Sequence, residues 1–271
     1  MTRVLKNKYM ILRRMSQSLV MLLYIASNIL GWNILTGNLS SSNFMQTVPL
    51  SDPFAVMQIA ATGALLTFDL VLGAVIIFAI YAIVAGRAFC SWVCPVNIIT
   101  DLANFLRRKL TLDAYEKKTF VSRNIRYWAI GLTFAISAIM GVAAFEFVSP
   151  VSMVHRGLIF GMGFGWATLV VIFLFDLFVL KNGWCGHICP LGGFYSVIGR
   201  NSILRVSHDS EKCTACMKCK VVCPEPQVLW MVAKQSKIVR DGECTNCARC
   251  IEVCDDDALN FSITNFLGRD K

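Results

Sequence analysis

Eight of the twelve cysteines occur in two identical spacings in the last quarter of the sequence, and this pattern restricts the fold more than any other feature. Each series reads Cys-x2-Cys-x2-Cys-x3-Cys, the spacing of bacterial ferredoxins that bind [4Fe–4S] clusters. In that pattern three cysteines surround one cluster and the fourth binds the other. The predicted ligands of one cluster are Cys213, Cys216, Cys219 and Cys254, and those of the other are Cys244, Cys247, Cys250 and Cys223.

Disulfides and zinc sites are the alternatives for cysteines so closely spaced. Zinc sites are usually formed by two Cys-x2-Cys pairs, whereas this chain has two full series of four. We therefore interpret residues 207–271 as an α+β ferredoxin domain of the bacterial type with two [4Fe–4S] clusters. Two clusters in one small domain lie close enough to exchange single electrons, which predicts a role in electron transport.

The rest of the chain is too apolar for an ordinary soluble domain, since 56% of the 271 residues are hydrophobic and the mean hydropathy is +0.59. Four apolar runs are long enough to cross a bilayer as helices, at about 17–36, 64–86, 127–149 and 158–180. No small-residue cleavage site follows the first run, so we expect a retained helix and not a signal peptide. Gly161, Gly163 and Gly165 are expected inside the fourth helix, where glycine permits close helix packing.

The net charge of +9 does not indicate nucleic-acid binding, because the basic residues are distributed as in a membrane protein. Residues 1–14 hold five lysines and arginines, residues 87–126 hold eight, and the chain from residue 181 onward holds twelve. The stretch 37–63 has none. Because positive loops stay in the cytoplasm, we expect a multi-pass protein of the bacterial cytoplasmic (inner) membrane, with both termini in the cytoplasm and two short outer loops.

The membrane part is predicted to be a duplication. Each half has an outgoing helix, an outer loop with proline, a returning helix and a Cys-x3-Cys-Pro motif, at 90–95 and at 185–190. Both halves begin and end on the same side, as in a parallel repeat. The predicted fold is thus an α-helical membrane domain over 1–206, with four transmembrane helices as a duplicated two-helix unit, followed by the ferredoxin domain over 207–271. An amphipathic helix on the inner membrane surface is expected after Pro95.

The motif cysteines Cys90, Cys94, Cys185 and Cys189 admit several roles. Cysteines four residues apart share one helical face. Together the four could hold a further metal or Fe–S centre, each pair could cycle between dithiol and disulfide, or they could bind copper or another soft metal transiently. Packing as small buried residues is the alternative without chemistry. We hypothesise that they take part in electron transfer near the inner face.

Ionisable side chains at membrane depth are candidates for quinol chemistry, because they are costly there unless they function. Asp69 and Glu146 are expected toward the outer ends of the second and third helices, and His155 at the outer mouth. We hypothesise that these three border an outer-side quinol pocket, and interfacial anchoring is the alternative. Haem is not supported, because none of the three histidines is paired within a transmembrane run.

The apolar runs, the two Cys-x3-Cys-Pro motifs and the eight-cysteine domain resemble one family over nearly the whole chain. The chain is similar to the NapH family, the membrane ferredoxin-type quinol dehydrogenase components of periplasmic nitrate reductase systems. This resemblance implies electron transfer from the quinone pool toward a periplasmic nitrate reductase, through a periplasmic iron–sulfur protein and cytochrome c partners. One departure is Asp255, which follows the last cysteine where proline is expected.

The leading hypothesis is therefore a quinol-linked subunit of a quinol dehydrogenase that moves electrons through 4Fe–4S clusters. One alternative is a membrane maturation factor that reduces a metal for insertion elsewhere. The other is a membrane anchor for a periplasmic iron–sulfur partner. The sequence does not distinguish menaquinol from ubiquinol.

Overall fold

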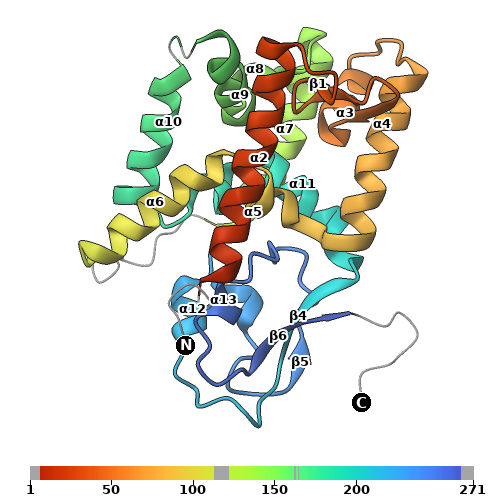
Figure 1. Ribbon diagram of the computed structural model, residues 1–271. Coiled ribbons are helices and arrows are strands. Elements are labelled where there is room, and N and C mark those ends of the chain that lie inside the picture. Colours follow the sequence, from red (N-terminus) through yellow and green to blue (C-terminus); the bar gives the residue numbers. More distant parts are fainter. Residues whose placement is uncertain (1–6, 113–121, 162, 164, 264–271) are drawn as a thin grey trace. The chain divides into compact units, whose positions relative to one another are not determined.

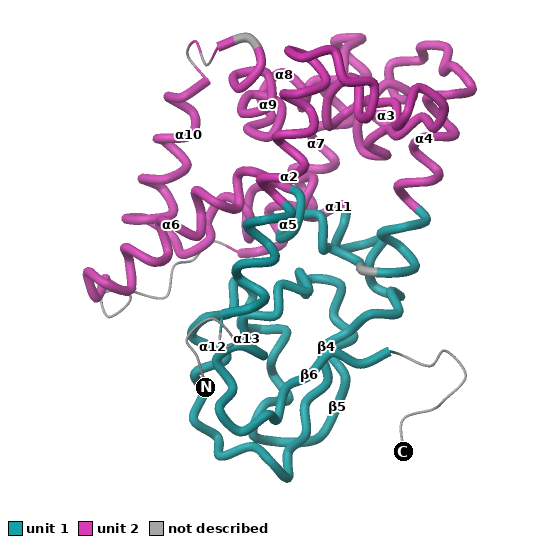
Figure 2. The backbone as a smooth tube through the Cα atoms, viewed as in Figure 1, with its two compact units in different colours: residues 1–16, 79–93, 195–271 teal, residues 17–78, 94–194 magenta. Residues whose placement is uncertain are grey.

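A computed structural model describes residues 7–112, 122–161, 163 and 165–263 (Figure 1). The chain forms two units, and neither is continuous in sequence (Figure 2). Unit 1 comprises residues 1–16, 79–93 and 195–271, and unit 2 comprises residues 17–78 and 94–194. The cysteine-rich domain therefore packs with two segments from the predicted membrane part. The boundary after residue 206 stays a prediction, since the units reflect packing and not sequence order.

Unit 1 contains a three-stranded antiparallel sheet and two short helices (Figure 1). Strand β4 (Leu204–His208) lies between β5 (Lys237–Ile238) and β6 (Leu259–Ile263). Helices α12 (Lys218–Val222) and α13 (Arg249–Glu252) each begin within one of the cysteine-rich loops. Side chains from the sheet and from both loops share one buried core. This is the α+β arrangement predicted for the domain.

Two segments from the predicted membrane part pack onto this domain. At the start of the chain, the backbone amide of Met10 donates a hydrogen bond to Glu252 Oε1 at 2.7 Å. In the other segment, the carbonyl of Ile83 accepts a hydrogen bond from the amide of Ile203, also at 2.7 Å. Both contacts join residues more than a hundred positions apart, so unit 1 is held together by long-range contacts.

The segment around residues 80–92 is a succession of short helices. A π-helix (Ile80–Ala85) is followed by a 3-10 turn (Gly86–Ala88) and by α5 (Phe89–Trp92). Gly86 has a φ of +57°, a conformation that glycine adopts without steric cost. A Cβ atom on Gly199 would lie 2.5 Å from Gly86 Cα. The two glycines therefore allow the two backbones to approach closely.

Unit 2 is built mainly from helices. Its small antiparallel sheet has the order β1 (Leu35–Gly37), β2 (Ser41–Phe44) and β3 (Val48–Ser51). The longer helices that contribute to it are α2 (Lys8–Leu30), α4 (Phe68–Ala79), α6 (Val96–Lys109), α7 (Ile125–Met140) and α10 (Gly165–Leu174). The shorter ones are α3 (Pro53–Ala61), α8 (Ala144–Val148), α9 (Pro150–Phe160) and α11 (Pro190–Ile198), with π-helices at Phe175–Val179 and Trp184–Ile188. Phe54 is fully buried and contacts the rings of Phe134, Phe145 and Phe194.

The order of elements repeats in the two halves, as the duplication predicted. Each copy has a helix that begins with proline, an apolar helix, a π-helix, the motif cysteines and a further helix. Pro53 and Pro150 begin α3 and α9, where a missing N–H group is harmless and the fixed φ suits a helix. The amphipathic helix expected after Pro95 is α6, which ends in three basic residues.

The helices differ from the apolar runs that predicted them, because α2 lies closer to the N-terminus than its run, whereas α4 and α7 are shorter than theirs. Helix α2 ends at Leu30, and α7 ends where Gly141 adopts a left-handed φ of +67°. The fourth run is not one helix, because α9 ends before Gly161, which has a φ of +94°, and α10 begins at Gly165. The expectation of a continuous helix was therefore wrong for Gly161 and Gly163, which lie between α9 and α10, whereas Gly165 is the first residue of α10.

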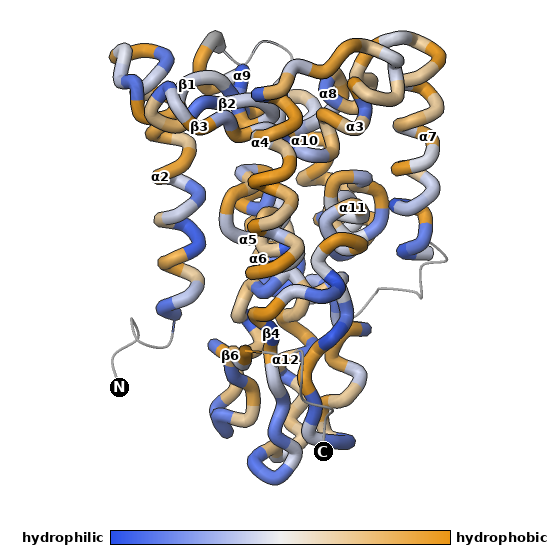
Figure 3. Tube along the Cα trace, turned by 90° about the vertical axis from the view of Figure 1, so that its right-hand side faces the viewer, coloured by the Kyte–Doolittle hydropathy of each residue, from blue (hydrophilic) through white to orange (hydrophobic). Residues whose placement is uncertain are grey.

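Among the described residues, no single helix is both long and apolar enough to cross a bilayer. One sharply bent pair, Phe68–Val84 with Gly86–Trp92, meets the length and composition criteria together. Figure 3 shows that α4 is hydrophobic along nearly its whole length. The number of transmembrane helices stays a prediction.

Candidate functional site

Two cavities in unit 1 are each lined by one of the two cysteine sets predicted from the spacing. The first cavity is lined by Cys223, Cys244, Cys247 and Cys250 and is here called the Cys247 cavity. Its empty volume is about 360 Å³, which includes open solvent. The second, of about 300 Å³ by the same measure, is called the Cys216 cavity and is lined by Cys213, Cys216, Cys219 and Cys254. The fold thus carries Cys223 and Cys254 across to the other loop, as the ferredoxin pattern requires.

The central strand β4 contributes to both cavities. Val206 lines the Cys247 cavity, and His208 lines the Cys216 cavity. Residues two apart on a strand point to the same face, so one face of β4 supports both sites. His208 is buried, and its Nδ1 lies 2.9 Å from the backbone oxygen of Gln235. That oxygen can only accept, so Nδ1 carries the proton.

The two cysteine loops have the same local geometry. The residues on either side of the second cysteine are left-handed in both loops: Ala215 and Met217 (φ +58° and +59°), and Asn246 and Ala248 (φ +48° and +60°). Alternation of left-handed and right-handed residues turns successive N–H groups into a concavity, which is common at Fe–S and phosphate sites. Both loops therefore suit a bound anionic cluster.

The thiols in the Cys247 cavity are buried. Burial raises the pKa of the Cys244 thiol to about 11, and it raises the pKa of the Cys223 and Cys250 thiols well above their usual value. Neighbouring thiols act in the same direction. Cluster binding must therefore displace protons from these cysteines, as metal binding by thiolates generally does. Four sulfur donors around each cavity fit a [4Fe–4S] cluster.

The four cysteines of the Cys-x3-Cys-Pro motifs are divided between the units. Cys90 is half-buried in α5 of unit 1, whereas Cys94, Cys185 and Cys189 belong to unit 2. All twelve cysteines are described, and none forms a disulfide. Apart from the two cluster cavities, which would each hold a four-iron cluster and not a single ion, no group of three or more His, Cys, Asp or Glu side chains in the described ranges is placed to hold a metal ion. The three chemical roles proposed for these cysteines stay predictions.

Buried polar groups surround the second motif. The amide of Trp184 donates to Asp176 Oδ1 at 3.0 Å, and Arg126 donates to the carbonyl of Gly186 at 3.3 Å. Both charged side chains are fully buried. Burial, and next the charge of a nearby arginine, lowers the pKa of His187 to about 4. Spacing did not reveal these neighbours, because Arg126 comes from α7, far from the motif in sequence.

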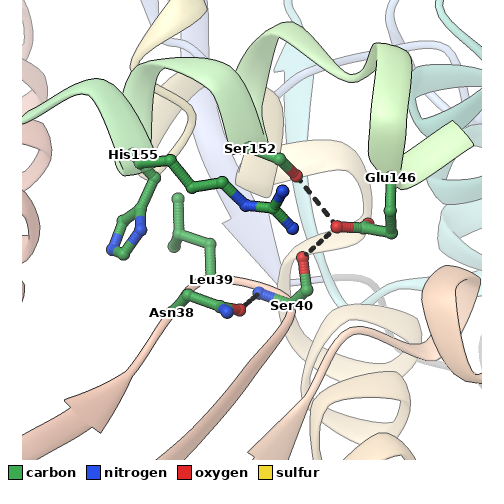
Figure 4. Close-up of a pocket in the computed structure, with 7 residues that line it drawn as sticks. Asn38, Leu39, Ser40, Glu146, Ser152 and His155 are labelled. Atoms are coloured by element: carbon green, nitrogen blue, oxygen red, sulfur yellow. Dashed lines mark hydrogen bonds between the residues drawn. The ribbon is translucent and has the colours of Figure 1, made fainter. Parts of the chain in front are cut away.

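A polar pocket in unit 2 is formed by α8, α9 and the turn between β1 and β2. Glu146 Oε2 accepts hydrogen bonds from Ser40 Oγ at 2.7 Å and from Ser152 Oγ at 2.9 Å (Figure 4). The imidazole of His155 lies at the opposite end of the group of side chains from this carboxylate. It is 3% exposed, and its Nε2 has no hydrogen-bond partner among the described residues. Burial, and then the charge of Arg156, lowers its pKa.

The structure thus brings together two of the three predicted quinol-side residues. Asp69 is exposed in the first turn of α4 and does not line this pocket. Gln58 follows Pro53 by five residues, as His155 follows Pro150, and so occupies the matching position of the first half. It is fully buried, and its Oε1 accepts a hydrogen bond from the amide of Phe145 at 3.0 Å. The matching position in the first half therefore has a structural role.

A buried ion pair in unit 1 was not predicted. Arg87 Nη1 lies 2.7 Å from Glu225 Oε1, and both side chains are almost completely buried. Glu225 also lines the Cys247 cavity. The available signal was weak: an arginine at the end of an apolar run, three residues before Cys90, and a glutamate directly after Pro224.

Comparison with known proteins agrees with this geometry. A 4Fe–4S dicluster domain matches residues 205–255, and a 4Fe–4S binding domain matches twice, over residues 66–113 and 159–207. The chain is 42% identical over 262 residues to the ferredoxin-type protein NapH of Escherichia coli (strain K12), which covers 95% of this chain and 90% of the relative. The chain belongs to the family of ferredoxin-type NapH and MauN proteins.

The NapH/MauN family includes relatives with different names. The methylamine utilization ferredoxin-type protein MauN of Methylorubrum extorquens is 41% identical over 251 residues, which is 92% of this chain and 86% of the relative. NapH of Haemophilus influenzae is 40% identical over 262 residues, which is 94% of this chain and 90% of the relative. No solved structure matches the chain. The resemblance inferred from the motifs is thus confirmed, and the protein is a ferredoxin-type electron-transport protein that binds 4Fe–4S clusters.

Proposed function

We propose that this member of the NapH/MauN family is a membrane-embedded subunit that takes electrons from quinol and passes them through two [4Fe–4S] clusters. The observation that carries the proposal is the sorting of eight cysteines into two cavities, four to each. When bound, such a cluster takes up and releases single electrons. The left-handed loop residues and the buried core hold the ligands in place.

Exposed apolar surface supports the membrane location. The helices α4, α7 and α10 carry large hydrophobic side chains that are mostly exposed, for example Phe68 (78%), Trp128 (80%) and Ile139 (84%). A soluble monomer rarely exposes large contiguous apolar patches. In a bilayer these side chains would contact lipid, and the charge distribution supports an orientation with both termini in the cytoplasm.

The pocket of Glu146 and His155 supports quinol as the electron donor. Oxidation of a hydroquinone to a quinone releases two electrons and two protons, and the protons need acceptors. The buried Nε2 of His155 accepts one and the Glu146 carboxylate accepts the other, because both line the same pocket and lie at opposite ends of it. The hydroxyls of Ser40 and Ser152 hold the carboxylate in position.

Family membership supports a proposal for the electron acceptor. On the resemblance to NapH, the proposed acceptor is a periplasmic nitrate reductase, reached through a periplasmic iron–sulfur protein and cytochrome c partners. Similarity to MauN, which is named for methylamine utilization, supports a different electron-transfer system as the alternative. The 4Fe–4S binding profile that matches around both Cys-x3-Cys-Pro motifs supports a part for Cys90, Cys94, Cys185 and Cys189 in this path.

Iron and sulfide counting on the anaerobically purified protein tests the cluster sites. We expect about eight iron atoms per chain and about four in Cys216→Ser or Cys247→Ser. Addition of a menaquinol or ubiquinol analogue should bleach the visible Fe–S absorption. If clusters are present but no quinol bleaches them, the protein is instead a metal-reducing maturation factor or a membrane anchor for a periplasmic iron–sulfur partner.

A further inference from the structure

The two cluster cavities differ in their walls, although their cysteine loops are alike. The Cys216 cavity is lined by His208, Met217 and Asp256 beside its four cysteines, and Cys216 itself is exposed. The Cys247 cavity contains Glu225, which is buried. A buried carboxylate needs a partner, and the Arg87 guanidinium provides it at 2.7 Å. Arg87 belongs to the segment Gly86–Trp92, which also carries Cys90.

A second contact joins the same segment to the same cavity. The indole N–H of Trp92 donates to the backbone oxygen of Asn246 at 3.1 Å, and Asn246 lies directly before Cys247. Arg87 Nη1 also approaches the backbone oxygen of Glu243 at 3.4 Å, directly before Cys244. The side chains of Arg87 and Trp92 thus contact the residues directly before two of the predicted ligands, Cys244 and Cys247. Cys90 lies between them in sequence.

Two further contacts join this part of the chain to residues 199–203, which precede β4. Gly86 packs against Gly199, and the amide of Ile203 donates to Ile83, just before β4. Because β4 supports the cavities, the segment is fixed relative to the strand as well as to the loop. All of these residues belong to unit 1.

On these contacts, and resting on the proposed cluster sites, we infer that Arg87 and Trp92 are positioning residues that make Gly86–Trp92 part of one cluster site and not of the other. The cluster of Cys223, Cys244, Cys247 and Cys250 is then the one coupled to the first Cys-x3-Cys-Pro motif. Arg87 places a buried positive charge beside it through Glu225. Trp92 holds the Asn246 backbone in place.

Redox titration followed by EPR on the full-length protein tests this inference. The variants Cys247→Ser and Cys216→Ser first assign the two reduced-cluster signals, since each variant should lose one. Arg87→Gln should move the signal assigned by Cys247→Ser to a lower potential, because loss of a buried positive charge disfavours the added electron. Trp92→Phe should change the line shape of that same signal. The other signal should stay unchanged in both variants.

The double variant Arg87→Gln/Glu225→Gln removes both charges, so the potential of this cluster should return toward that of the unmodified protein. Because the double variant leaves no unpaired buried carboxylate, it can be measured even where Arg87→Gln alone folds poorly. Lys218→Gln is the matched control, because Lys218 pairs with Asp255 near the Cys216 cavity and should leave the signal of the Cys247 cavity unchanged. Equal shifts of both signals, or no shift of either, would overturn the inference. A protein without any cluster signal or bound iron would instead refute the proposed function.

Discussion

At the scale of single residues, one pocket holds two proton acceptors of different chemistry. Two serine hydroxyls donate hydrogen bonds to the Glu146 carboxylate. The imidazole of His155 is buried, and its Nε2 has no hydrogen-bond partner among the described residues. The ring of Tyr24 packs edge-on against this imidazole at 4.7 Å between centroids. Hydroxyl groups and an aromatic wall therefore fix the positions of both acceptors.

We expect Glu146→Gln and His155→Gln each to slow quinol-driven reduction of the clusters by about 100-fold, because general-base groups contribute factors of this order. Stopped-flow bleaching of the Fe–S absorption with a quinol analogue measures this. Asp69→Asn is the control, since Asp69 is exposed and does not line the pocket. Reduction at the normal rate in both pocket variants would move the quinol site elsewhere.

The rate of quinol oxidation should fall in acidic solution, at a pH below the ordinary pKa of an imidazole. Burial and the charge of Arg156 lower the pKa of His155, so its imidazole is neutral at pH 7 and takes up a proton only in more acidic solution. Glu146 lines the same pocket, and Tyr24 faces the ring from α2. A pH–rate profile shows the effect, and the acid limb assigned to His155 should be missing in His155→Gln. Identical profiles for both proteins would contradict it.

At the scale of elements, the duplication is visible as the same succession of helices, each with a π-helix before the motif cysteines. The π-helices Ile80–Ala85 and Phe175–Val179 directly follow the apolar helices α4 and α10. Such widened turns are frequent at functional sites. Their recurrence at matching positions is further reason to expect chemistry at both motifs.

Gly199→Ala should lower the stability of unit 1 by about 1–3 kcal/mol, because overpacking of a close backbone contact has this effect. The added Cβ would lie 2.5 Å from Gly86 Cα. Thermal loss of the Fe–S absorption in detergent measures the change. Gly131→Ala in α7 is the control, since its Cβ would meet open space and alanine is the better helix former. Equal midpoints for the two variants would argue against the close approach.

At the scale of the whole molecule, each unit is assembled from separate stretches of the sequence. The ferredoxin domain packs with residues that precede it by more than a hundred positions. Contacts of such high sequence separation slow folding. The eight-cysteine domain expressed alone would lack Arg87 and leave the buried Glu225 carboxylate without this partner.

Reporter fusions test the proposed orientation. Alkaline phosphatase inserted directly after Gln46, in the turn between β2 and β3, should be active, because that turn is expected on the outer side of the membrane. Green fluorescent protein fused after Lys271 should fluoresce, since the C-terminal side is expected in the cytoplasm. Removing the basic residues of the first segment should weaken this asymmetry. An inactive phosphatase with a dark C-terminal fusion would reverse the topology.

Much of the fold was predicted from local patterns. Cysteine spacing predicted how the two sets separate, since a tight loop can direct only certain cysteines to one cavity. Proline and basic residues predicted the start and end of α6. The apolar run predicted a continuous helix through Gly161, and this was wrong, because hydropathy carries no information about the positive φ of that glycine. Local patterns also missed the sheet β1–β2–β3, whose short polar strands were expected to be only a loop.

The sequence by itself determined the chemistry of the cluster loops and the repeated order of elements, because both depend on residues close together in the chain. Only the tertiary structure decided that Glu146 and His155 share a pocket while Asp69 does not. It also decided that the segment of Cys90 is anchored to the Cys247 cavity, through Arg87 and Trp92. These contacts join residues brought together by packing, and side-chain pairs of that kind leave no periodic signal in a single sequence.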